Sequence, residues 1–597
     1  MTTETEAAAP PEKRGALQAL AVYGERRALV MLALGFASGL PNLLIFDTLS
    51  LWLRDAGLSL QVIAVFSLAT LAYSLKFLWA PLIDRTRVPG LNRWLGHRRS
   101  WMVVCQGLVM LGLWLVSGTD PATSLGLTAA FAIFVGFTAA TQDIVIDAWR
   151  IEAAAVEKQG AMAAAYQWGY RIAMITAGAA PLLLADAFNW NVSYAVMAAL
   201  MLVGIGGALA APREAQHAVR PIHADGLTAR PALEIPEWLA RLVLFALGAV
   251  VLGSGLAANA ALLQAGLTAL GAPDAGAAVA AAWELKPQGV YFQLAAVVAG
   301  LIVIVLAACP LPGVRTRPGV YLSAAMGDPL RDFFVRYRGV AALILALICL
   351  YRLSDFVLNI MNPFYADLGF SKTEIAEVRK VFGVVMSVAG VGLGGFAVAR
   401  LGLIRALVIG AFAGPLSNLV FAWLALQGAH MPALFIAIGV DNVASGFSGT
   451  CLIAYMSSLT SAGFTATQYA LFSSLYALPG KLIASQSGRI VEGVAASADA
   501  GSGFASLKAL FAATPPEAYA GAVEKSGVTP AALGAGYLAF FVYSALIGVA
   551  AIVLAFVVAA RSPNPQRPQS LKPPGRSPAP PAARAAGRRP PGRSSRW

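Results

Sequence analysis

The chain has 597 residues and a formal net charge of +13; 58% of its residues are hydrophobic and only 12% are charged. Its mean hydropathy is +0.69. Because soluble globular domains are about 45–50% apolar and about 25% charged, this composition excludes a chain surrounded by water and indicates one surrounded by lipid. Continuous apolar runs long enough for a ~30 Å hydrocarbon core predict an all-α polytopic membrane protein rather than a β-barrel.

The apolar runs predict about fourteen transmembrane helices. Polar boundaries then divide the chain into a cytoplasmic N-terminal segment (1–27), a six-helix bundle (28–211), a central region with two extra transmembrane helices (212–338), a second six-helix bundle (339–560) and a disordered basic cytoplasmic tail (561–597). The predicted spans are 29–46, 62–83, 102–116, 125–148, 161–184, 192–211, 239–263, 290–308, 340–364, 376–398, 404–426, 432–458, 467–491 and 533–559.

The distribution of basic residues predicts the orientation. With fourteen spans and the N-terminus inside, roughly thirty Lys and Arg fall on the cytoplasmic side and about five on the other, as the positive-inside rule requires. We therefore expect a bacterial inner-membrane protein with both termini in the cytoplasm. The positive charge then reflects topology, and no nucleic-acid partner is expected.

Two short segments suggest an internal repeat. Trp52–Ser59 and Phe364–Ser371 align an aromatic residue, an Asp, a Gly and a Ser, directly after the first span of each six-helix bundle. Two equivalent halves with a substrate site between them describe the major facilitator fold, with the two central helices as an insertion.

The loop after the second span supports the same fold. It opens with Asp84 and Arg85 and closes with Arg98 and Arg99, which resembles the Asp-Arg…Gly-Arg-Arg signature of major facilitator proteins. These four residues are expected to form a cytoplasmic gate, with Asp84 accepting from an Arg or from a helix N-terminus. The alternative is an ordinary basic loop.

Charged residues within the predicted spans are the candidates for function, because charge inside a membrane is costly and rarely incidental. Spans four and five carry an acid and a base, and so do their counterparts, spans twelve and thirteen. The alternative is that these groups only hold helices together. The proton-coupling candidates are Asp143, Asp147, Asp355 and Asp441. The substrate-binding candidates are Gln142, Tyr170, Arg171, Arg352, Lys481, Lys76, Asn442 and Trp168.

Several motifs resemble one known family, the AmpG muropeptide permeases. The resemblance extends over both predicted bundles and is strongest around Gln142; Thr141 and the Arg150-Ile-Glu152 stretch depart mildly from the family pattern. The segments that carry it are Leu34–Pro41, Lys76–Pro81 with Asp84 and Arg85, Ala140–Trp149, Gly169–Arg171, Tyr351–Asp355 and Thr465–Leu471.

The resemblance implies a proton-driven importer of GlcNAc–1,6-anhydro-MurNAc, with or without peptide, that serves peptidoglycan recycling and the signal for β-lactamase induction. The implied partners are this muropeptide, protons and membrane lipids, for a monomer without cofactor or metal. A major facilitator carrier of another polar or anionic cargo, such as a drug, a siderophore or an acyl-CoA-like anion, stays open. An enzyme is not expected, because the four His lie outside the predicted spans and no Ser/His/Asp set, metal cluster or Walker loop occurs.

Overall fold

We analysed a computed structural model of the chain. It describes residues 21–57, 71–213, 227–256, 259–285, 288–356, 360–484, 487–515 and 517–561. Every regular element in these residues is a helix, so the predicted all-α class is confirmed.

Helices from the first part of the chain pack on one another. The closest packing is between α2 and α10, and glycines make it possible: a Cβ added at Gly39 would lie 2.7 Å from the carbonyl oxygen of Tyr170. A Cβ at Gly169 would overlap the carbonyl of Leu32 in the same way. Small residues let the two backbones touch, as is common between membrane helices. The helices of this group are α2 (Arg26–Leu43), α8 (His97–Ser117), α9 (Leu125–Ala153), α10 (Gln159–Ala187) and α11 (Trp190–Ala210).

The second predicted span is broken where it is described. α5 (Leu71–Leu75) passes into a 3₁₀ turn, η4 (Lys76–Leu78), and α6 (Ala80–Arg85) begins after it. Pro81 lies in the first turn of α6, where a backbone N–H would have no partner within the helix, so its absence costs no hydrogen bond. The break therefore places Lys76 between two short helices. Residues 58–70 of this span lie outside the described part of the chain.

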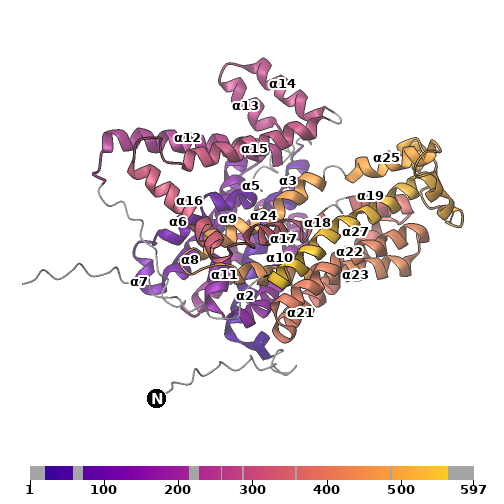
Figure 1. Ribbon diagram of the computed structural model, residues 1–597, viewed down its shortest axis with the longest axis horizontal. Coiled ribbons are helices and arrows are strands. Elements are labelled where there is room, and N and C mark those ends of the chain that lie inside the picture. The colour runs from indigo at the N-terminus through magenta and orange to yellow at the C-terminus, as the bar shows by residue number, and fades with distance from the viewer. Residues whose placement is uncertain are drawn as a thin grey trace, which may run out of the picture. The chain divides into compact units, whose positions relative to one another are not determined.

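The central region holds two long helices and a small hairpin. α12 (Pro231–Leu256) packs along α15 (Gly289–Ala308), and α13 (Ala261–Ala269) packs against α14 (Pro273–Glu284), as Figure 1 shows. The predicted span 239–263 extends beyond α12, because the apolar composition of the sequence continues past Leu256.

A sharp bend precedes the second group of helices. α16 (Arg317–Arg336) lies in a stretch that the sequence predicted only as polar, and it meets the following helix at 107°. Gly339, with φ +87°, lies at the bend. The predicted span 340–364 is then divided among α17 (Ala341–Leu350), α18 (Leu353–Phe356) and α19 (Met361–Leu368). The break between α17 and α18 places Arg352 in a turn.

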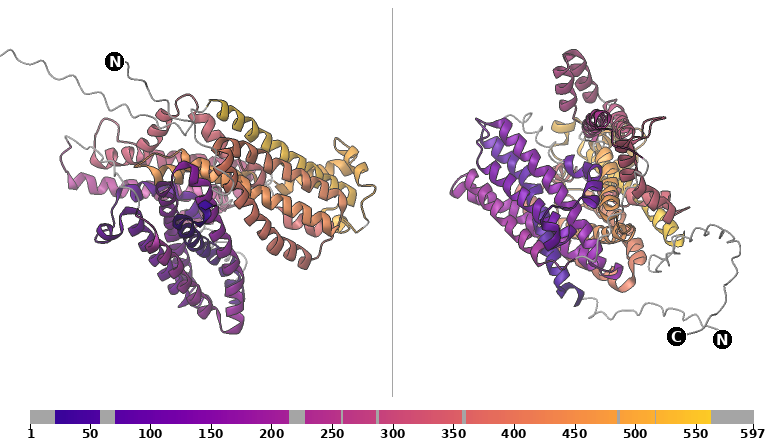
Figure 2. Two further views of the ribbon diagram at one scale, coloured as in Figure 1. Left: turned by 90° about the horizontal axis from the view of Figure 1, so that it is seen from below. Right: turned by 90° about the vertical axis from the view of Figure 1, so that its left-hand side faces the viewer.

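The remaining helices form the second packed group, seen in orange and yellow in Figure 2. A short helix, α20 (Lys372–Glu377), and a π-helical turn, η7 (Val378–Phe382), lead into it, and α25 (Ser487–Asp499) follows α24. Shorter helices, η8 (Ala505–Phe511) and α26 (Ala522–Ser526), precede α27. The long helices of this group are α21 (Gly383–Leu401), α22 (Leu403–Gln427), α23 (Met431–Ser458), α24 (Thr465–Ala484) and α27 (Pro530–Arg561).

The repeated segments end their helices in the same way. α3 (Leu49–Asp55) stops just before Gly57, and α19 stops just before Gly369; both glycines have positive φ, +82° and +104°. The Asp55 carboxylate accepts a hydrogen bond from Trp190 Nε1 at 3.0 Å, and the Asp367 carboxylate accepts one from Tyr537 OH at 2.8 Å. Trp190 opens α11 and Tyr537 lies near the start of α27, so each Asp ties the first predicted span of its group to the sixth.

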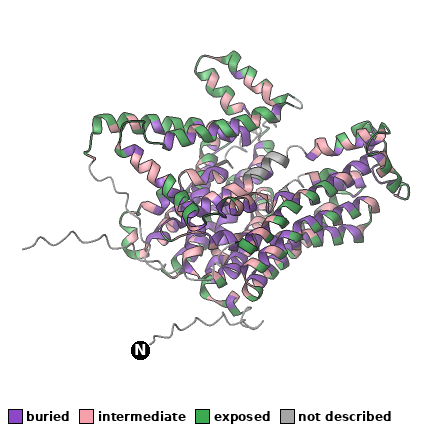
Figure 3. Ribbon diagram, viewed as in Figure 1, coloured by how far each residue is buried: buried purple, intermediate pink, exposed green. Residues whose placement is uncertain are grey.

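Nine helices in the described part of the chain are long and apolar enough to span a membrane, or ten if the bent pair at α16–α17 is one span. The other predicted spans fall on α2, on the broken α5–α6 segment, on α10 and on α24, all of which carry polar residues. Figure 3 shows exposed residues along α12, α13 and α14, and buried residues where α9, α10 and α24 meet. The count is therefore consistent with about fourteen membrane helices.

Candidate functional site

A polar cavity of about 380 Å³ lies between helices of the two groups. Its walls come from α5 and η4, α9, α10, the turn at Arg352, α23 and α24. The lining residues are Tyr73, Ser74, Lys76, Asp143, Asp147, Tyr166, Gln167, Tyr170, Arg171, Arg352, Ile453, Met456, Tyr469, Ser473, Tyr476 and Ala477. Small-molecule sites commonly measure about 300–1,000 Å³, so the cavity has room for a ligand.

Asp147 is held between two cations. Its carboxylate lies 3.8 Å from Lys76 Nζ and 3.3 Å from Arg150 Nη2, and all three side chains are buried. Arg150 also donates to Ser457 Oγ at 2.8 Å and stacks over the Tyr469 ring at 5.0 Å. A buried charge is tolerated when it is paired and hydrogen-bonded, as the Asp147 carboxylate is here.

Asp143, one helical turn before Asp147, has different surroundings. It is also buried, but its contact among the described residues is a hydrogen bond from the Ser38 hydroxyl, which in turn lies 2.7 Å from Tyr166 OH. No ion pair to Asp143 occurs in the part of the chain that the structure describes. The two neighbouring carboxylates of α9 therefore differ: one is ion-paired, and the other is buried with hydroxyl groups.

Two guanidinium groups face the cavity from opposite groups of helices. Arg352 Nε donates to Asp355 Oδ2 at 2.9 Å, and its Nη2 donates to Ser445 Oγ at 2.7 Å. Arg171, on α10, lines the same cavity. Two cations thus share one cavity although like charges repel.

The cavity walls are rich in tyrosine. Five tyrosines line the cavity, and each offers an apolar ring face together with a hydroxyl group. Tyr170 OH accepts a hydrogen bond from Asn42 Nδ2 at 2.6 Å, and Tyr166 lies beside it with ring centroids 6.2 Å apart. The tyrosines are Tyr73, Tyr166, Tyr170, Tyr469 and Tyr476.

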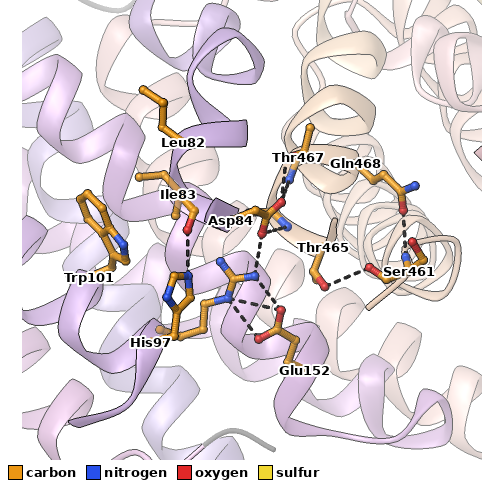
Figure 4. Close-up of polar contacts among 12 residues, drawn as sticks. Leu82, Ile83, Asp84, His97, Trp101, Glu152, Ser461, Thr465, Thr467 and Gln468 are labelled. Atoms are coloured by element: carbon orange, nitrogen blue, oxygen red, sulfur yellow. Dashed lines mark hydrogen bonds and ion pairs between the residues drawn. The ribbon is translucent and has the colours of Figure 1, made fainter. Parts of the chain in front are cut away.

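Asp84 joins the two groups of helices beside this cavity (Figure 4). Its carboxylate accepts from the backbone N–H of Thr467 at 2.8 Å, from the Thr467 hydroxyl at 2.7 Å and from the backbone N–H of Ala466 at 3.2 Å. Ala466 and Thr467 are in the first turn of α24, where backbone N–H groups have no partner within the helix. Asp84 thus caps α24 from the far end of α6, and the helix dipole adds to the attraction.

Arg98 and Glu152 complete this network. Arg98 Nη2 lies 2.7 Å from both Asp84 and Glu152, and the Arg98 side chain is fully buried. The ion-paired triad links α6, α8 and α9 behind the contact with α24. We call Asp84, Arg98, Glu152 and Thr467 the α24 latch.

The other two basic residues predicted for the gate make different contacts. Arg85 donates to the carbonyl of Ala324 at 3.2 Å and lies 4.0 Å from Asp328, both on α16. Arg99 donates to the carbonyls of Ala208 and Leu209, the last turn of α11. Arg85 therefore faces the bent helix, and Arg99 caps α11.

α16 also contacts the other side of the latch. Asp332 accepts from Ser461 Oγ at 2.7 Å and from Gln468 Nε2 at 3.1 Å, and Arg336 donates to the carbonyl of Leu459 at 2.9 Å. The helix thus binds the loop before α24 at one end and Arg85 at the other.

Comparison with known proteins shows what this chain is similar to. The chain is 28% identical over 475 residues to the transporter AmpG 4 of Rickettsia conorii, covering 79% of this chain and 91% of the relative. It is 29% identical over 478 residues to the anhydromuropeptide permease of Escherichia coli, covering 80% of this chain and 76% of the relative. The chain is therefore similar to AmpG transporters and permeases over about four-fifths of its length.

A family model described as acetyl-coenzyme A transporter 1 matches residues 28–125 of the chain. Among solved structures, a double-tryptophan variant of XylE matches with a TM-score of 0.50 at 11% identity, covering 91% of this chain and 96% of XylE. Another XylE structure, described as a major facilitator superfamily proton:xylose symporter, matches with a TM-score of 0.48 at 10% identity, covering 89% of this chain and 95% of XylE. The similarity to the double-tryptophan variant shows the fold.

Half of the predicted proton and substrate candidates line the cavity. They are Lys76, Asp143, Asp147, Tyr170, Arg171 and Arg352. Asp355 lies behind Arg352 as its ion-pair partner, and Asp441 accepts from Ser417 Oγ at 3.2 Å. The side chain of Lys481 lies outside the described residues.

Three further candidates make backbone contacts. Gln142 donates to the carbonyl of Ala37 at 2.9 Å, and Asn442 donates to that of Ile438 at 2.9 Å. Trp168 donates to the carbonyl of Val388 at 2.9 Å and stacks on Tyr23 with centroids 5.1 Å apart. Trp168 therefore ties α10 to α21 instead of lining the cavity.

Sequence reasoning missed Ser38, Glu152 and most of the cavity tyrosines. One usable signal was present: Tyr166 and Tyr170, and Gln167 and Arg171, are each four residues apart on α10 and so share a face. No comparable signal marks Glu152, whose role depends on an Arg 54 residues away.

Proposed function

We propose that this chain is a proton-coupled importer of GlcNAc–1,6-anhydro-MurNAc, with or without its peptide, and not an enzyme. The name of the Escherichia coli relative, anhydromuropeptide permease, and the match over four-fifths of the chain support this cargo. The direction is from periplasm to cytoplasm, for the recycling of cell-wall fragments and the inducing signal for β-lactamase.

The cavity supports this cargo class. Its volume suits a small molecule, its tyrosines offer ring faces to a sugar, and its cations suit the carboxylates of the lactyl group or peptide. The substrate-binding residues in this proposal are Lys76, Tyr170, Arg171 and Arg352, with Tyr166 and Gln167 added by their positions.

Asp143 is the proton carrier in this proposal. Asp147 and Asp355 are ion-paired, so protonating them would leave buried cations without a partner. Asp441 and Asp143 have hydroxyl partners, but Asp441 does not belong to the cavity lining and Asp143 does. The single observation that carries the proposal is therefore that the carboxylate of Asp143 is buried in the cavity wall beside hydroxyl groups.

The orientation follows from the basic loop after the second span. With that loop in the cytoplasm, the α24 latch closes the cytoplasmic side of an inner-membrane protein, and both termini are cytoplasmic. The functional unit in this proposal is a monomer, with the substrate site between the two helix groups.

Uptake into proteoliposomes tests the function. The reconstituted protein should accumulate labelled GlcNAc–1,6-anhydro-MurNAc when the outside is acidic, and a protonophore should abolish accumulation. Asp143→Asn should abolish uphill accumulation while still exchanging labelled for unlabelled cargo, because exchange needs no net proton movement. Retained accumulation in Asp143→Asn would remove Asp143 as proton carrier, and no uptake by the native chain would overturn the cargo.

An acyl-CoA-like anion is the alternative cargo. The match of residues 28–125 to the acetyl-coenzyme A transporter model favours it, although that segment contains only one wall of the cavity. Competition by acetyl-CoA, together with failure of unlabelled muropeptide to compete, would select the alternative.

A further inference from the structure

The charged side chains that line the cavity are unbalanced. Three are cations, Lys76, Arg171 and Arg352, and two are carboxylates, Asp143 and Asp147, so the lining keeps an excess of one positive charge even when both acids are ionised. Lys76 has Asp147, and Arg352 has Asp355. Arg171 is the remaining cation.

Arg171 has no carboxylate partner among the residues that the structure describes. It lies on α10 one residue after Tyr170, and it lines the same cavity as another guanidinium, that of Arg352. A half-buried cation beside a second cation is unfavourable unless an anion is placed between or beside them. A bound anion would supply what the chain itself does not.

Arg352 is already oriented for such a ligand. Its Nε and Nη2 are occupied by Asp355 and Ser445, which fixes the plane of the guanidinium. Its Nη1 points toward Gly449, where an added Cβ would lie 3.2 Å from it. Glycine at this position keeps the space beside Nη1 open. Fixed guanidinium groups bind carboxylates and phosphates through paired hydrogen bonds.

We propose that Arg171, with Arg352, forms an anion subsite that selects cargo carrying a free carboxylate. The proposal rests on the proposed function, in which the anion is the lactyl or peptide carboxylate of the muropeptide. The shared chemistry with the alternative cargo is an oxyanion, since a phosphate of a CoA-like molecule would suit the same two guanidinium groups.

The subsite has a consequence for selectivity. A neutral sugar of the same shape would fill the tyrosine-lined part of the cavity but leave Arg171 unsatisfied, so it should bind weakly. Arg171 and Arg352 come from different helix groups, so one anion held by both would also join the two groups across the cavity. The carboxylate thus serves for recognition and for bringing the halves together.

Binding of an acid and its ester tests the subsite. The purified full chain in nanodiscs would be titrated with GlcNAc–1,6-anhydro-MurNAc, with its lactyl methyl ester, and with acetyl-CoA. The native chain should bind the acid about 10–100-fold more tightly than the ester, the range expected for hydrogen bonds to a charged group. Arg171→Gln should reduce that ratio to near one by weakening the acid alone, and Arg171→Lys should keep part of it.

Two controls separate binding from folding. Arg405→Gln makes the same substitution at an exposed residue of α22 and should keep the native ratio. Thermal unfolding of each variant shows whether the protein is intact, and the ester affinity of Arg171→Gln shows whether the cavity is intact.

The outcomes distinguish the inference from the proposed function. Equal affinity of the native chain for acid and ester, or equal weakening of both by Arg171→Gln, would overturn the anion subsite and leave muropeptide transport standing. Binding of acetyl-CoA but of neither sugar, with loss in Arg171→Gln, would keep the subsite with phosphate as its ligand and overturn the muropeptide. Binding of none of the three probes would overturn both.

Discussion

The carboxylate of Asp84 accepts hydrogen bonds from both the backbone N–H and the hydroxyl of Thr467, a residue 383 positions later in the chain. Asp84 also accepts from Arg98, so one buried carboxylate joins helices of both groups. Breaking this contact should change which side of the transporter is closed.

Asp84→Ala should therefore open the side that the α24 latch closes. The substitution removes the acceptor for Thr467 and Ala466, and each hydrogen bond to a charged group is worth about 1.5–3 kcal/mol. A thiol-specific reagent applied from the cytoplasmic side should label a cysteine placed at Ser473, on the cavity wall, faster than in the native background. Uptake should fall at the same time.

Asp120→Asn is the control for this prediction, because the hydrogen bonds of the Asp120 carboxylate within the described part of the chain go to Ala122 and Thr123 in its own turn. Labelling at Ser473 should be unchanged in that variant. If Asp84→Ala leaves the labelling rate at the native level, the latch does not govern access to the cavity.

Asp147→Asn should destabilise the protein more than Asp143→Asn does. It leaves Lys76 and Arg150 without their carboxylate, and removing one partner from a buried pair costs about 3–5 kcal/mol. Melting temperature and detergent-soluble yield measure the difference. A rescue arm is available: Lys76→Met combined with Asp147→Asn should recover part of the lost stability. Equal melting temperatures for the two single variants would contradict this division of roles.

The sequence predicted the membrane class, the charged helices and half of the latch, because these depend on local composition and on a short motif. Asp84 and Arg98 stand in one loop, so their signature is readable. Their partner Thr467 belongs to the other helix group, and nothing in its local sequence indicates that it donates hydrogen bonds to Asp84. Glu152 was noted only as a departure from the family pattern, yet it completes the ion-paired network.

Breaks in helices were the part that hydropathy could not predict. Lys76 and Arg352 both lie where a predicted continuous span is interrupted, and both interruptions occur inside apolar sequence. Trp168 was a substrate-binding candidate; its indole N–H instead donates to a backbone carbonyl on α21. Periodicity locates a residue on a helix face, but it does not say which neighbour that face meets.

Gly169→Ala should lower stability, because the new Cβ would overlap the carbonyl of Leu32 where α10 crosses α2. Overpacking of this kind costs about 1–3 kcal/mol, and the two helices also carry Ser38 and Tyr166 beside Asp143. Gly206→Ala provides the matched control, since no atom lies within 4 Å of its added Cβ and alanine favours the helix. Thermal unfolding in detergent should show a lower midpoint for Gly169→Ala alone; the same midpoint in both variants would mean that the crossing tolerates a methyl group.

The loop before α27 should loosen in acid because of Asp499. Thr529 Oγ1 donates to its carboxylate at 2.6 Å and Lys508 Nζ lies 3.0 Å away, and these contacts, the Thr529 hydrogen bond first, hold the pKa of Asp499 below its usual range. A lowered pKa means that the folded loop favours the ionised form. The contribution of Asp499 to the stability of the loop is therefore complete above the unfolded pKa of about 3.9 and is lost as the pH falls through the lower folded pKa.

Hydrogen–deuterium exchange of the peptides from Ala505 to Thr529, corrected for the intrinsic rate, should show constant protection from neutral pH to about 4.5 and a decline at more acidic pH. Asp499→Asn should show the lower protection already at neutral pH, whereas Asp120→Asn should not alter it. Unchanged protection throughout the acidic range would show that another contact holds this loop.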